Sequence, residues 1–183
     1  MKKLAMVLVL GASMISVPAL AASGDVSGNV TITGAVASKC QFVTNSATIT
    51  IVPDMAAADG TLDASTVNGQ SATLNGWCNK TASTMSVNAT QLTNSTVASV
   101  QPGFVREVTY TATADAFDFN NAAISGGSAT DSNSTDGTDG TAVNVNMFRG
   151  DIKVTLSNAA TASGLLAAGS YSGNVKVTLS PAI

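Results

Sequence analysis

Apolar and polar residues alternate with a period of two along most of the chain. Short segments with this pattern are Ala47–Val52, Ser71–Cys78, Thr84–Leu92, Phe104–Ala114, Val143–Met147, Ile152–Leu156 and Val175–Leu179. Successive side chains of a strand point to opposite faces, so this pattern predicts strands with one buried face. The best helical candidate, Asn158–Ala168, is a short turn interrupted by Gly164. The pattern therefore predicts an all-β protein, and seven or eight strands with turn-rich connections indicate a β-sandwich.

The longest alternating segment lies near the N-terminus, from Val26 to Cys40. Its positions of one parity are Val26, Gly28, Val30, Ile32, Gly34 and Val36, and the intervening residues are mostly polar. We expect an amphipathic strand here, and no hairpin partner lies beside it in the sequence. Its partner is either another copy of the protein or, as for an ordinary first or last strand, a segment of the same chain.

The first 21 residues have the three parts of a secretion signal. Lys2 and Lys3 are followed by the mostly apolar stretch Leu4–Ile15 and by the cleavage-site pattern Ala19-Leu20-Ala21. A retained membrane anchor is the alternative, but the apolar stretch is shorter than the roughly 20 residues of a spanning helix. We predict a mature chain that begins at Ala22 and has no membrane span.

Length and charge restrict the possible partners. About 160 mature residues are enough for one domain with a substantial core. Loss of Lys2 and Lys3 changes the formal net charge from -3 to about -5. The remaining basic residues are spread along the chain, so no basic patch supports binding to nucleic acid.

Cys40 and Cys78 are the only cysteines. In the oxidising compartment that the signal implies, we expect them to form one disulfide. A metal site or a redox pair is the alternative. Metal binding would need further ligands, and the chain has no histidine, whereas a redox pair usually has C-x-x-C spacing.

Residues 120–141 form a polar stretch of Ser, Gly, Asn, Asp and Thr, predicted to be a solvated, mobile loop. Its acidic and amide residues also suggest calcium binding; they are Asp131, Asn133, Asp136 and Asp139. However, Asp136 stands where an EF-hand loop needs glycine, and no glutamate closes the loop. We therefore expect no metal site.

The residues needed for most catalytic constellations are missing. Without histidine, Ser/His and Cys/His nucleophile systems are excluded. The pairs Asp115/Asp118 and Asp136/Asp139 leave a glycosidase-like hydrolase as an alternative. We expect a protein that is not an enzyme and needs no cofactor.

Three motifs, in this order, resemble subunits of the chaperone–usher fimbrial (pilin) family. The first is V-x-I-x-G-x-V-x-x-x-C from Val30 to Cys40, which is similar to the start of mature pilins. The second, Leu74–Asn79 with the following Met85 and Val87, is similar to the pilin strand that ends at the second cysteine. The third, Leu165–Leu179, also resembles the ending of spore-coat-U-like secreted domains.

The resemblance implies an immunoglobulin-like β-sandwich that lacks its final strand. It assigns residues 22–38 to an N-terminal extension and 39–183 to the pilin-like domain. The extension would be a donor strand through Val26, Gly28, Val30, Ile32, Gly34 and Val36, with donation centred on Val26–Ile32 and an anchored part from Gly34. The acceptor groove would lie beside the last strand, with Val175, Val177 and Leu179 at its edge.

The same resemblance implies a function. The protein would be a structural subunit of a bacterial surface fimbria that supports adhesion or biofilm, exported through the periplasm to the cell surface. Its partners would be other pilin subunits, a periplasmic chaperone and an outer-membrane usher. The alternative is a monomeric secreted binding or coat module that completes its own sandwich.

Overall fold

The computed structural model describes residues 28–51, 54–132, 134–135 and 137–183. The chain divides into two compact units, 1–35 and 36–183. In the first unit, the described residues 28–35 are exposed and belong to no helix or strand. The predicted signal peptide, residues 1–21, and the predicted donor residue Val26 lie outside the described residues.

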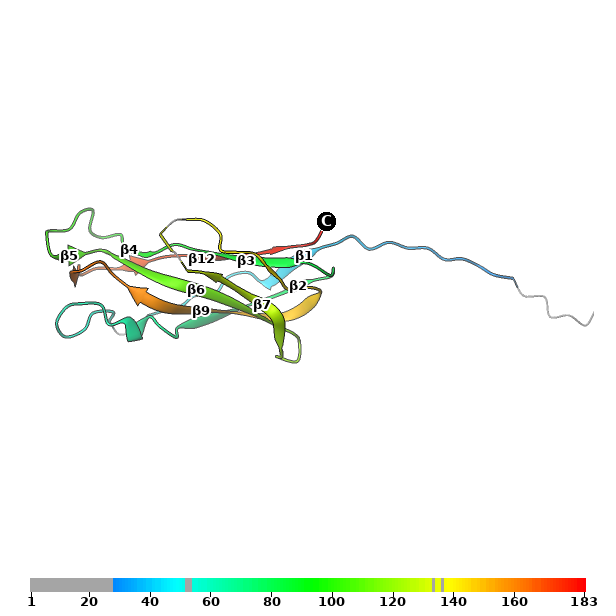
Figure 1. Cartoon of the computed structure of the whole chain (residues 1–183), viewed down its shortest axis with the longest axis horizontal. Coiled ribbons are helices and arrows are strands. Elements are labelled where there is room, and N and C mark those ends of the chain that lie inside the picture. Colours follow the sequence, from blue (N-terminus) through cyan, green and yellow to red (C-terminus); the bar gives the residue numbers. More distant parts are fainter. Residues whose placement is uncertain (1–27, 52–53, 133, 136) are drawn as a thin grey trace, which may run out of the picture. The chain divides into compact units, whose positions relative to one another are not determined.

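The larger sheet of residues 36–183 has the strand order β1-β2-β9-β6-β4-β11, and β7 also pairs with β6. All of its paired strands are antiparallel. The strands are β1 (Cys40–Thr44), β2 (Ser71–Cys78), β4 (Leu92–Asn94), β6 (Glu107–Phe117), β7 (Ala123–Asp131), β9 (Phe148–Ala160) and β11 (Tyr171–Ser172). Figure 1 shows β2, β9 and β6 crossing the domain as long neighbouring strands.

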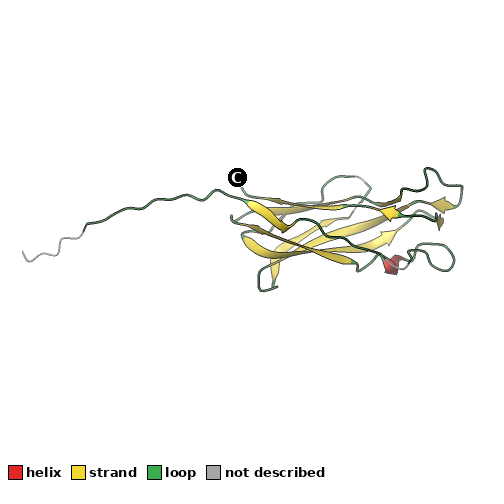
Figure 2. Cartoon of the chain, turned by 180° about the vertical axis from the view of Figure 1, so that it is seen from behind, coloured by secondary structure: helices red, strands yellow, loops and turns green. Residues whose placement is uncertain are grey.

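A second sheet contains β12 (Val175–Ser180), β3 (Thr84–Ala89) and β8 (Val143–Asn144), in the order β12-β3-β8. Two further strands, β5 (Phe104–Val105) and β10 (Leu165–Leu166), form a short parallel pair. The 3₁₀ turn η1 (Ala64–Thr66) is the red segment of Figure 2, which otherwise shows strands and loops. The described chain is all-β, with curled antiparallel sheets that are consistent with a β-sandwich.

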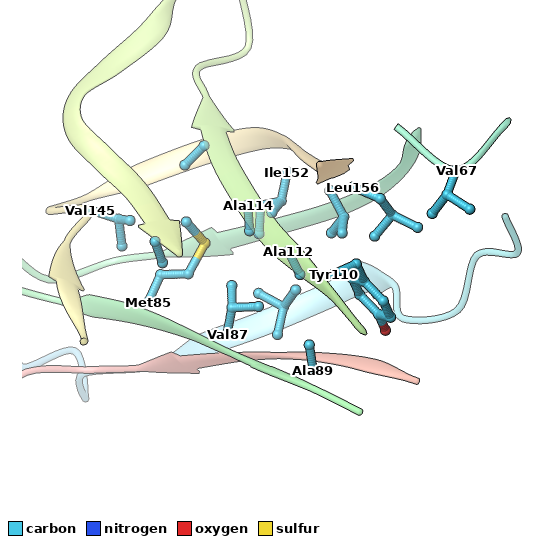
Figure 3. Packing of buried hydrophobic residues seen from close by; sticks show 14 of the residues in the cluster. Val67, Met85, Val87, Ala89, Tyr110, Ala112, Ala114, Val145, Ile152 and Leu156 are labelled. Atoms are coloured by element: carbon cyan, nitrogen blue, oxygen red, sulfur yellow. The ribbon is translucent and has the colours of Figure 1, made fainter. Parts of the chain in front are cut away.

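The core lies between the two sheets (Figure 3). Met85 and Val87 of β3 lie on one side of it, and Ala112 and Ala114 of β6 lie on the other, all fully buried. Ile152 of β9 is also fully buried. The small alanines of β6 leave space for the larger side chains of β3 and β9, which is how large and small residues fill a close-packed interior.

Strict alternation predicted the main strands correctly. The burial pattern of β3 and of the first half of β9 alternates residue by residue, as expected for a strand with one face in the core. The structure confirms the strands expected at Ser71–Cys78 and Val175–Leu179. The helical turn considered for Asn158–Ala168 is wrong, because β9 continues to Ala160 and β10 follows.

One other sequence prediction needs correction. The polar stretch 120–141 is not simply a loop, because β7 occupies Ala123–Asp131 and pairs with β6. The buried positions of β7 are Gly127, Ala129 and Asp131, whose small or polar side chains hide the period-two pattern. The segment Val26–Cys40, expected to pair as a strand, carries no strand within the single chain at residues 28–39, and β1 begins at Cys40.

Candidate functional site

The two cysteines join the first two strands at one end of the domain. Cys40 and Cys78 form a disulfide with an S–S distance of 2.02 Å, which confirms the predicted bond. The same two residues face each other in the β1–β2 register. The bond therefore fixes the position at which the chain enters the domain.

A groove with apolar side chains along its floor lies between β12 and the chain that follows β1, and we call it the β1–β12 groove. The hollow that β12 lines, which we call its main hollow, has a volume of about 500 Å³. A second hollow of about 720 Å³ adjoins it, because the two share five lining residues. The apolar side chains that line the main hollow are Phe42, Ile49, Ile51, Leu74, Leu92, Tyr110, Val154, Leu156, Val175 and Val177.

One bank of the groove is β12. This strand pairs with β3 through six residue pairs, from Val175↔Ala89 to Ser180↔Thr84. Within the described part of the chain, no strand pairs with the other edge of β12. That edge therefore presents unpaired backbone donors and acceptors, which are able to bind an added strand.

Two of the three predicted acceptor residues line the groove. Val175 and Val177 lie in its main hollow. Leu179 instead packs on β2: a Cβ on Gly76 would come within 3.2 Å of the Leu179 Cδ1 atom. The absence of a side chain at Gly76 thus allows Leu179 to pack against β2, next to the end of the groove that lies nearer the disulfide.

The opposite bank is the segment 45–51, which sequence analysis assigned to a strand at Ala47–Val52. Its described residues, 45–51, form no strand, and Val52 lies outside the described residues. Among the described hydrogen bonds, none involves the backbone of this segment. The alternating Ile49 and Ile51 are half-buried against the core. The pattern was right about the inward orientation of these two side chains and wrong about a paired strand in the described residues 45–51.

The far edge of β3 is covered, unlike that of β12. Every second residue of β3 and of the chain just after it has a partner from the segment 131–144. These contacts are the pair Met85↔Val143, Gly140 N–H to the Val87 carbonyl (2.7 Å), Ala89 N–H to Asp131 Oδ2 (2.7 Å) and Gln91 N–H to the Ser134 carbonyl (2.9 Å). The polar segment predicted to be mobile thus acts as an edge cover.

Tyr110 reaches from β6 to the end of the groove where β12 begins. Its hydroxyl donates a hydrogen bond to the Thr90 carbonyl at 2.7 Å. The Thr90 N–H in turn donates to the Asn174 carbonyl at 2.8 Å. Burial, and then the charge of Asp131, raise the pKa of Tyr110 to about 12. Sequence analysis did not identify this role of Tyr110, because the role depends on residues far away in the chain.

The raised pKa of the Tyr110 hydroxyl predicts how the stability of the protein changes at alkaline pH. Its folded pKa exceeds that of an unfolded tyrosine, about 10. The unfolded state therefore loses this proton first, and stability falls as the pH rises from about 10 to about 12. Tyr110→Phe is expected to lose about 1 kcal/mol at pH 8, where the hydrogen bond is intact, and to depend less on pH above 10. Urea unfolding at a series of pH values measures both effects; an equally steep fall in Tyr110→Phe would contradict the assignment.

The acidic residues considered for catalysis or calcium have local roles in the described part of the chain. Asp118 Oδ1 accepts backbone N–H groups of Asn120 and Ala122 in the turn between β6 and β7, at 2.8 and 2.9 Å. Asp115 faces Lys153 across the β6–β9 pair. Asp136 lies outside the described residues. No group of three or more His, Cys, Asp or Glu among the described residues is placed to hold a metal ion.

Comparisons with family models, with curated proteins and with solved structures found no match. Among the described residues, no helix is long and apolar enough to cross a membrane.

Proposed function

We propose that this protein is a structural subunit of a bacterial surface fibre and polymerises by strand addition. The β1–β12 groove of one copy receives the N-terminal segment of the next copy. The observation that carries this proposal is the groove itself. It combines an apolar floor with unpaired backbone on both banks, at β12 and at segment 45–51. An inserted strand would find hydrogen-bond partners on both sides and an apolar surface beneath.

The N-terminal segment has the properties that such an occupant needs. Val30, Ile32 and Val36 share one parity and are 83%, 90% and 89% exposed. Burying one such side chain contributes about 1.5–3 kcal/mol. The run from Val26 to Val36 would extend over about 36 Å as a strand, at about 3.3 Å per residue. We call this run the arm.

The strand order supports the proposal that the domain is an immunoglobulin-like sandwich without its final strand. The sheet β1-β2-β9-β6 lies opposite the sheet β12-β3-β8. In such a sandwich, the place next to β12 would belong to one further antiparallel strand. The arm would occupy that place in a neighbouring copy.

Partners and location follow from the same chemistry. An arm that leaves one copy and enters another makes a heterologous contact, which produces a fibre when it does not close into a ring. A periplasmic chaperone would cover the apolar groove before assembly, since an open edge otherwise aggregates, and an outer-membrane usher would export the subunits. The Cys40–Cys78 disulfide is compatible with an oxidising, exported environment. Adhesion or biofilm formation is the proposed use of the fibre.

Aspartate substitutions of opposite parity in the arm test this function. In the first variant, Val30→Asp and Ile32→Asp put charges on the face proposed to enter the groove, which is unfavourable because unpaired charges would be buried. In the matched control, Thr31→Asp and Thr33→Asp put the same charges on the other face. We expect the wild type and the control to form multimers that survive an unheated denaturing gel, and the first variant to form none. Deletion of residues 22–33 should likewise abolish the multimers.

The outcomes separate this function from its alternative. A self-complemented secreted binding or coat module predicts a monodisperse monomer for the wild type by light scattering. Equal multimer formation by both aspartate variants would show that the apolar face of the arm is not the contact. Either result would overturn strand addition by this segment.

A further inference from the structure

Asn79, directly after Cys78, holds the chain that enters β1. Its side-chain Oδ1 accepts the Lys39 N–H at 2.6 Å, and its Nδ2 donates to the Ala37 carbonyl at 2.9 Å. Its backbone N–H donates to the Lys39 carbonyl at 3.0 Å. We call these three hydrogen bonds the Asn79 clasp. They continue the β1–β2 pairing beyond the disulfide.

The clasp requires a side chain that both accepts and donates. An asparagine amide supplies an acceptor and a donor on one planar group. Aspartate at neutral pH supplies acceptors only, so it would keep the bond from Lys39 and lose the bond to Ala37. Alanine would lose both side-chain bonds. These differences make position 79 testable with small substitutions.

The clasp lies where exposed residues without hydrogen bonds give way to residues that are hydrogen-bonded to the domain. Residues 28–36 are exposed, and no hydrogen bond among the described residues involves them. Among the described residues, Ala37 is the first that is hydrogen-bonded to the domain. Sequence analysis expected the anchored part to begin at Gly34, three residues earlier.

We propose that Asn79 is a positioning residue that fixes the root of the arm at Ala37 and leaves the residues up to Val36 for insertion into a second copy. This inference rests on the proposed function. A fixed root reduces the conformational freedom that the arm loses on insertion, because every residue released at the root must be ordered again. Asn79 thus acts on donation of the arm and leaves the groove that accepts it unchanged.

The test compares the full-length wild type with Asn79→Ala, Asn79→Asp and the control Asn75→Ala. Asn75→Ala also removes an exposed side-chain hydrogen bond, from Asn75 to Asp151 at 2.8 Å, but this position lies away from the arm root. Loss of two exposed hydrogen bonds is expected to slow multimer formation about tenfold in Asn79→Ala. Asn79→Asp should show a smaller effect, and Asn75→Ala should match the wild type.

Two further measurements separate positioning from a general structural role. A labelled synthetic peptide of residues 22–36 probes the acceptor groove, and its affinity for Asn79→Ala should stay within about twofold of wild type. Amide hydrogen exchange at Lys39 should accelerate at least tenfold in Asn79→Ala, because this N–H loses its acceptor. Unchanged exchange, or an equal loss of peptide affinity and multimer rate, would overturn the inference. A wild type without multimers overturns the proposed function, and the exchange measurement still decides whether Asn79 fixes the root.

Discussion

Replacing Cys40 and Cys78 together with alanine is expected to lower the free energy of unfolding by about 4 kcal/mol. In the chain-entropy treatment, a disulfide restricts the unfolded chain more strongly as the closed loop grows. The two cysteines are separated by 38 positions, which gives this magnitude. Alanine is preferred to serine because Cys78 is only 2% exposed, and a hydroxyl there would be buried. Urea unfolding followed by the fluorescence of Trp77, the single tryptophan, measures the loss.

Reduction of the wild type provides the matched control for this prediction. With a reductant present throughout the titration, the wild type should unfold at nearly the same urea concentration as the double variant. The single variants Cys40→Ala and Cys78→Ala should also unfold at nearly the same urea concentration, since either substitution prevents the disulfide. A loss below about 1 kcal/mol in all of these samples would mean that the unfolded chain is already restricted without the disulfide.

Ile152→Ala is expected to lower the free energy of unfolding by about 4 kcal/mol, within the usual range of 2–5 for such truncations. Ile152 is fully buried in β9, between Leu74 of β2 and Ala116 of β6 in the strand register. The alanines of β6 have no flexible side chains that could move into the space left behind. The cavity should therefore stay largely open, which puts the cost in the upper half of the range.

An exposed isoleucine in the same chain provides the control. Ile32 is 90% exposed. Ile32→Ala should therefore change the free energy of unfolding of the monomer, measured by urea titration, by no more than about 0.5 kcal/mol. Equal losses in the two variants would contradict the burial of Ile152. The control is also informative about assembly, because Ile32 belongs to the arm face that we propose to insert.

Large apolar residues in strict alternation made most of the strands predictable. In β12, for example, Val175, Val177 and Leu179 alternate with polar residues, and the strand lies where this pattern predicts it. β7 could not be predicted in the same way. Its inward positions carry glycine, alanine and aspartate, which have little apolar surface, and its pairing with β6 depends on the tertiary structure.

The candidate site was predictable only in part. Val175 and Val177, which share one parity in the sequence, both line the groove. The other bank was missed, because whether segment 45–51 pairs depends on what lies beside it in space. The hydrogen bonds of Asn79 were also beyond sequence reasoning, since their partners lie about 40 positions earlier in the chain.

The cover over the far edge of β3 would have a consequence for the form of the proposed fibre. A subunit with one arm and one open acceptor would bind two neighbours, and its polymers would grow as single unbranched chains. If segment 131–144 left β3 uncovered, each unit would gain a second acceptor, and growth would give branches or lateral sheets. Hydrogen bonds made by a polar, glycine-rich segment would thus help to keep the proposed assembly one-dimensional.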